Sequence, residues 1–119
     1  MDCLFCKIAE GSIPAEKVYE DEHVLAFKDI QPQAPVHLLV IPKKHIASLD
    51  EAGPEDAELL GRVTLAARKV ARDAGIAENG YRVINNCGKD SGQVVFHIHF
   101  HVLGGEPLGP LLVKSPGSE

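Results

Sequence analysis

Residues 94–103 read Val-Val-Phe-His-Ile-His-Phe-His-Val-Leu, and this stretch predicts a strand around which the rest of the fold is arranged. Successive side chains of a strand point to opposite faces, so His97, His99 and His101 are expected to share one face. Neighbouring histidines of such a row would lie roughly 6.6 Å apart, and the outer two roughly 13 Å apart. This spacing favours separate imidazoles over one metal centre that uses all three.

Length and composition bound the class of protein. The chain has 119 residues, of which 45% are hydrophobic and 24% charged, and we expect one globular domain over residues 1–119. The net charge of -5 argues against broad binding to nucleic acid. No apolar run approaches the roughly 20 residues of a membrane-spanning helix, and the N-terminus does not resemble a signal peptide. We therefore expect a cytoplasmic protein with neither nucleic acid nor membrane as a partner.

The order of the expected elements predicts the fold class. A short helix is expected over residues 2–8, and the best helical pattern runs over residues 54–74, with Gly75 beyond its end. Strands are expected over residues 16–19, 23–27, 36–41, 81–85 and 94–103. Strands and helices do not alternate regularly. The prediction is therefore an α+β fold with a mainly antiparallel sheet of about five strands, one long helix and a short N-terminal helix.

The loop before the histidine stretch contains Gly88 and Gly92. Glycines would let its backbone N–H groups turn toward one point, which is a way to hold a phosphate, although an ordinary hairpin loop explains them equally well. A neutral imidazole can attack an electrophile while a second one donates a proton. His99 lies centrally and is the natural nucleophile, and attack on phosphorus would give a phosphoryl-histidine intermediate. His37, on a strand that could pair nearby, could add a further contact.

The sequence His97-Ile98-His99-Phe100-His101-Val102-Leu103 resembles the His-φ-His-φ-His-φ-φ signature of the histidine triad (HIT) family, where φ is an apolar residue. Further stretches resemble the Hint branch of that family: IP at 13–14, FKDI at 27–30, PQAP at 32–35, VIPKKH at 40–45, GQ at 92–93, LGG at 103–105 and, as in bacterial members, PLGP at 107–110. The resemblance implies a HIT-like fold, a homodimer whose sheets join across the interface, and a purine nucleotide bound beside the triad. It also implies hydrolysis of nucleoside 5′-phosphoramidates, such as adenosine 5′-monophosphoramidate, to the nucleoside monophosphate and an amine.

The same resemblance assigns roles to individual residues. It implies that His99 is the nucleophile and that His101 contacts the phosphate, with His37 and His97 as the other catalytic histidines. The implied nucleotide-binding residues are Phe5, Ile8, Ile13, Phe27, Asp29, Ile30, Asn86, Gly92, Gln93, Val94, Val95, His99 and His101. The apolar residues up to Phe27 would wall the base, and Asp29 and Ile30 would meet the ribose. Val94 departs from relatives that have a serine there, which leaves its effect on rate open.

Cys3 and Cys6 form a Cys-x-x-Cys. Alone, this pair fits a redox site, half of a metal site, or no site at all. Some HIT proteins with this pair bind zinc together with a histidine like His45 and the first histidine of the triad. The resemblance therefore implies a structural zinc ion on Cys3, Cys6, His45 and His97, and no metal in the chemical step.

Two other functions fit the same residues. The protein could prefer dinucleoside polyphosphates, as another branch of the HIT family does. It could also be a nucleotide-binding regulatory module with little catalysis, which its small size and Val94 permit. The natural amine, the preferred purine and any protein partner do not follow from the sequence.

Overall fold

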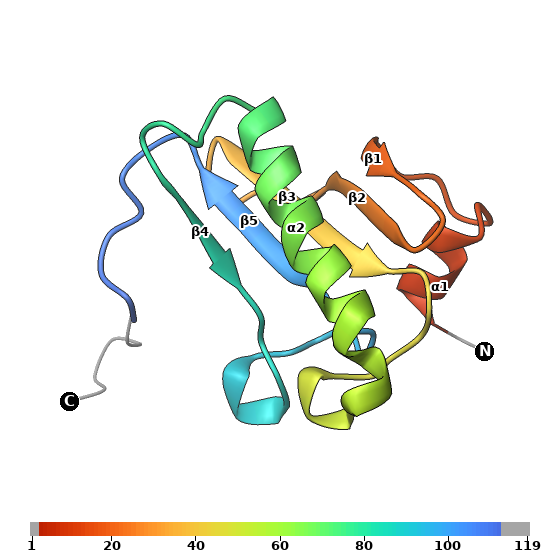
Figure 1. Ribbon diagram of the computed structural model, residues 1–119. Coiled ribbons are helices and arrows are strands. Elements are labelled where there is room, and N and C mark those ends of the chain that lie inside the picture. The colour runs from red at the N-terminus through yellow and green to blue at the C-terminus, as the bar shows by residue number, and fades with distance from the viewer. Residues whose placement is uncertain (1–2, 113–119) are drawn as a thin grey trace.

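A five-stranded sheet places the histidine stretch next to its central strand (Figure 1). The computed structural model describes residues 3–112 of the chain. Its strands are β1 Lys17–Glu20, β2 Val24–Lys28, β3 Val36–Pro42, β4 Tyr81–Ile84 and β5 Phe100–Gly104, and its α-helices are α1 Leu4–Ala9 and α2 Ala57–Asp73. The strand order is β1-β2-β3-β5-β4, and every neighbouring pair is antiparallel. The expected α+β fold class is confirmed.

The two faces of the sheet carry different apolar layers, because side chains alternate along each strand. The layer toward α2 contains Val24, Ala26, Leu38, Val40 and Val102, and the layer toward α1 contains Leu25, Phe27, Leu39 and Ile41. His37 has the same parity as Leu39 on β3, and β3 pairs Leu39 with His101. Alternation thus puts His37 and His101 on the α1 side, opposite the long helix.

Helix α2 packs on the sheet through residues three and four apart, and these include Val63, Ala67 and Val70. The expected helix over residues 54–74 starts later as an α-helix, because Pro54–Asp56 form a 3-10 turn. That turn is closed by Asp56, whose carboxylate accepts from the Gly53 N–H at 3.0 Å. The end is as expected, with Gly75 in the left-handed region at φ 79°.

The strand expected over residues 94–103 is wrong in its first half. Only Phe100–Gly104 is a strand, and the backbone bends at residues 95–97. The Ile98 N–H donates to the Ile46 carbonyl at 2.7 Å, and the His97 side chain is completely buried beside Cys3. These contacts outweigh the strand preference of the alternating sequence, as tertiary packing commonly does. The expectation that His97, His99 and His101 form an evenly spaced row on one face of a strand is therefore also wrong.

The remaining boundaries differ by one or two residues. The N-terminal helix was expected over residues 2–8 and occupies Leu4–Ala9, with Cys3 as its N-cap; residue 2 lies outside the described part of the chain. The strand expected from His23 starts at Val24, because Asp21 accepts from the backbone N–H groups of both residues and forms a turn there. Among the described helices, none combines the length and the apolar character needed to cross a membrane.

Candidate active site and metal-binding cluster

Three of the histidines assigned to catalysis form one contact group on the α1 side of the sheet. The Nε2 atom of His37 lies 2.9 Å from Nδ1 of His101, which follows from the pairing of β3 with β5. The rings of His99 and His101 lie 5.1 Å apart between centroids and meet edge to face. His97 is the exception, because the bend at residues 95–97 turns its ring toward the two cysteines of the N-terminus.

Hydrogen bonds fix the tautomers of His37, His99 and His101 in their neutral forms. A carbonyl only accepts, so His99 must donate from Nδ1 to the His97 carbonyl at 2.8 Å. The Gln33 N–H donates to Nδ1 of His37 at 3.0 Å, so neutral His37 carries its proton on Nε2 and donates to Nδ1 of His101. His99 is left with a free lone pair on Nε2, whereas His101 is left with an N–H on Nε2.

Burial keeps His37 and His101 neutral near pH 7. It is the main cause that lowers the pKa of His37, and the nearby Asp29 carboxylate, 3.4 Å away, opposes it only in part. Burial, followed by the neighbouring His99 and His37, lowers the pKa of His101 to about 4. A proton added to Nδ1 of either ring would displace the hydrogen bond that this atom accepts, so the low pKa values of His37 and His101 preserve the tautomers described above.

A cavity of about 480 Å³ opens in front of His99 and His101. Its volume lies in the range of about 300–1,000 Å³ that is typical of small-molecule sites. The residues predicted to bind a nucleotide that line it are Phe5, Ile8, Ile13, Phe27, Asp29, Ile30, Asn86, Gly92, Val94, Val95, His99 and His101. Ile30 and Val94 are 95% and 84% exposed. The cavity thus exposes apolar side chains to solvent.

Aromatic packing builds the inner wall of this cavity. Phe5 meets Phe27 edge to face at 5.6 Å between centroids, and it meets His99 in the same way at 5.1 Å. Asp29, at the end of β2, accepts from the Gln31 N–H at 2.8 Å, which fixes the turn that follows. A flat apolar ligand would therefore face Phe5 and Phe27, while a phosphorus atom near His99 would face the polar end.

Gln93 is predicted to bind the nucleotide, but its side chain points into its own loop. Its side chain does not line the cavity: Nε2 donates to the carbonyls of Ala47 and Val95, and Oε1 accepts from the Gly88 N–H at 2.8 Å. Gln93 therefore braces the loop from inside. The N–H groups of Gly88, Gly92 and Gln93 all donate within this loop, which differs from the expectation that its glycines aim their N–H groups at a phosphate.

Several residues that line the cavity were not predicted, and these are Leu4, Pro14, Ala15, Lys28, Gln31 and Leu39. Alternation along the strand could have identified Leu39, because it has the same parity as His37. The others follow from the path of the N-terminal segment and of the loop after β2, which no short-range pattern specifies.

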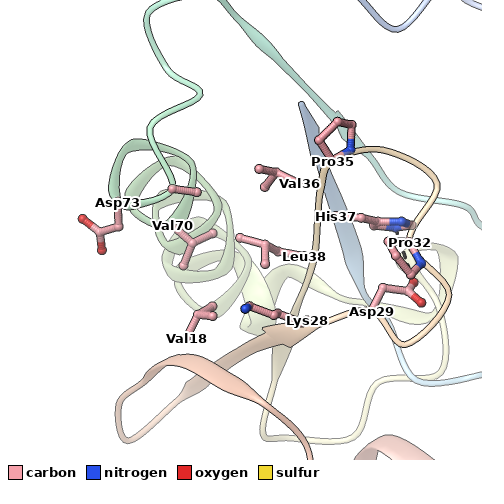
Figure 2. A pocket seen from close by; sticks show the side chains of 11 residues that line it. Val18, Lys28, Asp29, Pro32, Pro35, Val36, His37, Leu38, Val70 and Asp73 are labelled. Carbon is pink, nitrogen blue, oxygen red and sulfur yellow. Dashed lines mark ion pairs between the residues drawn. The ribbon is translucent and has the colours of Figure 1, made fainter. Parts of the chain in front are cut away.

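A second cavity of about 450 Å³ lies on the α2 side (Figure 2). Val18, Leu38 and Val70 point into it, and Lys28, which pairs with Glu16 at 2.6 Å, lies at its edge. His37 and Asp29 reach its lining only from the other side of β3. Neither His99 nor His101 lines this second cavity, whereas both line the first one.

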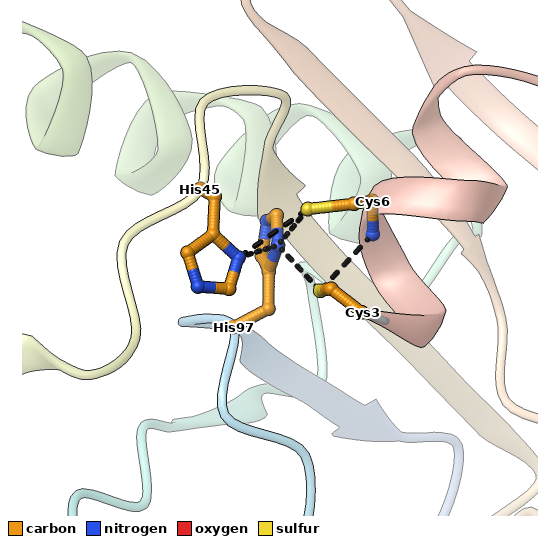
Figure 3. A group of neighbouring side chains, drawn as sticks. All are labelled: Cys3, Cys6, His45 and His97. Atoms are coloured by element: carbon orange, nitrogen blue, oxygen red, sulfur yellow. Dashed lines mark hydrogen bonds between the residues drawn. The ribbon is translucent and has the colours of Figure 1, made fainter. Parts of the chain in front are cut away.

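Cys3, Cys6, His45 and His97 form a four-residue cluster (Figure 3). The Nδ1 atoms of His45 and His97 lie 3.3 Å apart, and the sulfur–nitrogen distances are 3.3 Å from Cys3 to His97 and from Cys6 to His45, and 3.5 Å from Cys6 to His97. A tetrahedron with ordinary Zn–N and Zn–S bond lengths has edges of roughly 3.3 Å between nitrogens and roughly 3.6 Å between sulfur and nitrogen. The cluster is thus a possible metal site of the Cys₂His₂ type.

The surroundings of the cluster also suit a metal ion. His97 donates from Nε2 to the Pro42 carbonyl at 2.7 Å, which leaves the lone pair of Nδ1 facing the cysteines. Burial and then Cys3 raise the pKa of the Cys6 thiol to about 11, whereas a coordinated divalent cation would deprotonate a thiol outright. The donor set and its tautomers therefore fit zinc.

Asp29, His37 and His101 form a second group with metal-ligand chemistry. The hydrogen bonds argue against it as a metal site. A metal on Nε2 of His37 would need the ring proton on Nδ1, and that atom already faces the Gln33 N–H. The two groups therefore differ. In the cluster with the cysteines, Nδ1 of His97 directs a lone pair toward Cys3 and Cys6. In the second group, a proton lies between the rings of His37 and His101.

The chain is similar to known proteins over most of its length. The model of the family described as HIT domain matches residues 10–108. The chain is 48% identical over 111 residues, 93% of each chain, to the Purine nucleoside phosphoramidase of Escherichia coli (strain K12). The crystal structure of a HIT family hydrolase from Legionella pneumophila is similar at a TM-score of 0.89 and 52% identity, covering 91% of this chain and 96% of that one. A histidine triad protein from Clostridium difficile gives 0.90 and 49%, covering 92% and 96%.

Proposed function

We propose that this chain, which belongs to the HIT domain family, hydrolyses purine nucleoside 5′-phosphoramidates such as adenosine 5′-monophosphoramidate. The name of its Escherichia coli relative, a purine nucleoside phosphoramidase, supports this substrate class. The observation that carries the proposal is the free Nε2 lone pair of His99 beside the Nε2–H of His101, at the polar end of an apolar cavity. A lone pair on one imidazole can attack phosphorus while the N–H of its neighbour donates to the leaving amine.

The first step forms a bond between His99 Nε2 and phosphorus. As the P–N bond of the substrate breaks, its electron pair stays on the amine nitrogen, which takes a proton from Nε2 of His101. His37 donates to Nδ1 of His101, and this hydrogen bond stabilises the negative charge that develops on His101 as it gives up its Nε2 proton. The amine leaves, and the nucleotide remains attached to His99.

The second step reverses these roles. A water molecule attacks phosphorus, the bond from phosphorus to His99 breaks, and the proton of the water restores the Nε2–H of His101. The nucleoside monophosphate leaves, and both rings return to their first tautomers. Because the His97 carbonyl keeps the proton of His99 on Nδ1 throughout, the enzyme starts each cycle with the same nucleophilic nitrogen.

We assign the base to the wall that Phe5 and Phe27 form, with Ile8 and Ile13 beside it. The ribose would then lie near Asp29 and Ile30, where the Asp29 carboxylate can accept from ribose hydroxyls. Asn86, Gly92, Val94 and Val95 would line the phosphate side. Gln93 would act there indirectly, by holding the loop.

Zinc is the metal that we assign to Cys3, Cys6, His45 and His97. When bound there, it supplies a cross-link between the N-terminal turn, the connection after β3 and the segment before β5. The three free thiols of the chain fit a reducing compartment, so we place the protein in the cytoplasm. We also propose a homodimer, in which β4 at the edge of the sheet joins a second copy.

The test replaces His99 by alanine and measures turnover of adenosine 5′-monophosphoramidate. Loss of a covalent nucleophile should lower kcat by about a thousandfold or more. His23→Ala is the matched control, since that histidine is exposed and lies outside the cavity, and it should retain wild-type turnover. Turnover by His99→Ala close to that of the wild type would contradict the assignment.

Two further measurements separate the alternatives. A nucleotidyl adduct trapped on His99 of the wild-type protein argues for an enzyme over a regulatory module that only binds nucleotides. Faster turnover of a diadenosine polyphosphate than of the phosphoramidate would instead place the protein with the dinucleoside polyphosphate hydrolases.

A further inference from the structure

The metal-binding cluster and the nucleophile share one short segment of chain, and we propose that Cys3, Cys6, His45 and His97 act as positioning residues for His99. None of the four lines the cavity, so they would not touch the substrate. They would act by holding the tautomer and the orientation of the His99 ring. This inference rests on the proposed role of His99 as nucleophile and on the proposed zinc ion.

The first connection runs through His97. Its side chain belongs to the cluster, with Nδ1 3.3 Å from Cys3 and 3.5 Å from Cys6, while its own carbonyl accepts from Nδ1 of His99 at 2.8 Å. The segment is bent here and is not part of the sheet, so strand hydrogen bonds do not hold that carbonyl. The direction of the His97 carbonyl therefore depends on what holds the His97 ring.

The second connection runs through Phe5, which lies between the two cysteines on α1. Its ring is buried and meets His97 at 6.1 Å and His99 at 5.1 Å between centroids, in both cases edge to face. A metal ion that fixes Cys3 and Cys6 also fixes the position of Phe5. The ring of His99 then has a defined wall against which to lie.

The third connection runs from His45 to the residue before the nucleophile. Ile46 follows His45, and its carbonyl accepts from the Ile98 N–H at 2.7 Å. His45 is joined to His97 through the cluster at 3.3 Å between their Nδ1 atoms. The backbone on the N-terminal side of His99 is thus held at Ile98 as well as at His97, and both attachments lead back to the cluster.

A defined consequence follows for the ring of His99. With the cluster intact, only the tautomer protonated on Nδ1 satisfies the His97 carbonyl, and Nε2 is free to attack. When the cluster is opened, that carbonyl can turn away and the tautomer protonated on Nε2 becomes populated, which cannot attack phosphorus. The fraction of competent enzyme falls, so kcat should fall while KM changes little, because the walls that hold the nucleotide include many residues beyond the cluster.

The direct test reads the tautomer of His99 by nitrogen-15 NMR of protein labelled at its histidines. The zinc-loaded wild type should show His99 protonated on Nδ1 alone. Cys6→Ser, with its loss of zinc verified by metal analysis, should show a mixture of the two tautomers and a kcat at least about tenfold lower with KM within about twofold. Cys87→Ser is the control thiol, since Cys87 lies outside the cluster, and it should match the wild type in zinc, tautomer and kcat.

A second measurement needs only the wild-type protein and stays informative if Cys6→Ser does not fold. Removal of zinc from the wild type with a chelator should give the same mixture of His99 tautomers, and added Zn²⁺ should restore protonation on Nδ1 alone, with circular dichroism showing that the stripped protein is folded. A folded, zinc-free protein, whether Cys6→Ser or the stripped wild type, with an unchanged His99 tautomer would overturn the proposal. Turnover by His99→Ala would instead overturn the nucleophile assignment and leave the tautomer result standing.

Discussion

At the scale of single residues, burial sets the charge of His37 and His101 before any substrate is bound. His101 is the clearest case, since burial and the adjacent His99 and His37 lower its pKa to about 4. Its ordinary value in an unfolded chain is about 6.5. Between these two values the unfolded chain binds a proton that the folded protein does not, so acid favours unfolding across that range.

We therefore predict that the free energy of unfolding falls as the pH is lowered from about 6.5 to about 4, with His101 as one source of the slope. Above that range His101 is neutral in both states and adds no pH dependence. The measurement is urea unfolding at a series of pH values for the wild type and for His101→Gln, which has a similar size and does not titrate. Both proteins keep the metal-binding cluster, so its acid sensitivity cancels in the difference. The variant should have the shallower slope, and parallel curves would contradict the pKa shift of His101.

The residue types in the sequence predicted which chemical groups gather at the site better than they predicted where each group lies. The alternating pattern correctly put His101 and Val102 on opposite faces, and the pairing of β3 with β5 brings His37 to His101 as anticipated. The same pattern was wrong for His97, because a contact with Cys3, 94 positions away, decides where its ring lies. No local rule contains that distance. The inward position of the Gln93 side chain was missed for the same reason, since it donates to the Ala47 carbonyl 46 positions away.

At the scale of elements, the end of β5 packs so closely that it excludes a side chain. A Cβ atom on Gly104 would lie 2.8 Å from Cδ1 of Ile76, which is a buried member of the layer under α2. Gly61 is the opposite case, an exposed glycine inside α2 with no heavy atom near the position of its missing Cβ. One substitution should therefore have opposite effects at the two positions.

Gly104→Ala should lower the free energy of unfolding by about 1–3 kcal/mol, because Ile76 must move out of a packed layer. Gly61→Ala should raise it by about 0.5–1 kcal/mol, because alanine restricts the unfolded chain and suits a helix interior. Urea unfolding of both variants and of the wild type, all prepared with the same metal content, measures the two differences. Equal signs at the two positions would show that the contact with Ile76 does not govern the Gly104 site.

Element types were predictable because each has a short-range cause. The three- and four-residue spacing of Val63, Ala67 and Val70 identifies α2, and Gly75 identifies its end. The order of strands across the sheet was not predictable in this way. β5 lies between β3 and β4, and this insertion depends on pairings between residues about 65 positions apart, such as His37 with Leu103.

At the scale of the whole molecule, the sheet has two unequal edges. β1 carries charges at both ends, Lys17 and Glu20, which pair with each other at 3.1 Å, and its register with β2 is interrupted between Lys17 and Tyr19. Charges and irregularities of this kind protect an edge strand from pairing with another chain. β4 reads Tyr-Arg-Val-Ile, and its single charge, Arg82, donates to the carbonyl of Gly109 at 2.9 Å. The edge at β4 is therefore the one suited to joining a second copy.

The proposed homodimer predicts a molar mass in solution twice that of one chain. Val83 on β4 is 42% exposed and lies opposite Val102, on the face of the sheet that packs against α2. Val83→Asp would put a charge into the joined edge and should weaken dimerisation by about a hundredfold or more, since an unpaired buried charge is costly. Sedimentation equilibrium measures both masses. Val18→Asp is the matched control, because Val18 is 39% exposed on the opposite edge strand β1, and it should leave the dimer intact. A monomeric wild type would refute the dimer, whereas dissociation by Val18→Asp alone would move the interface to β1.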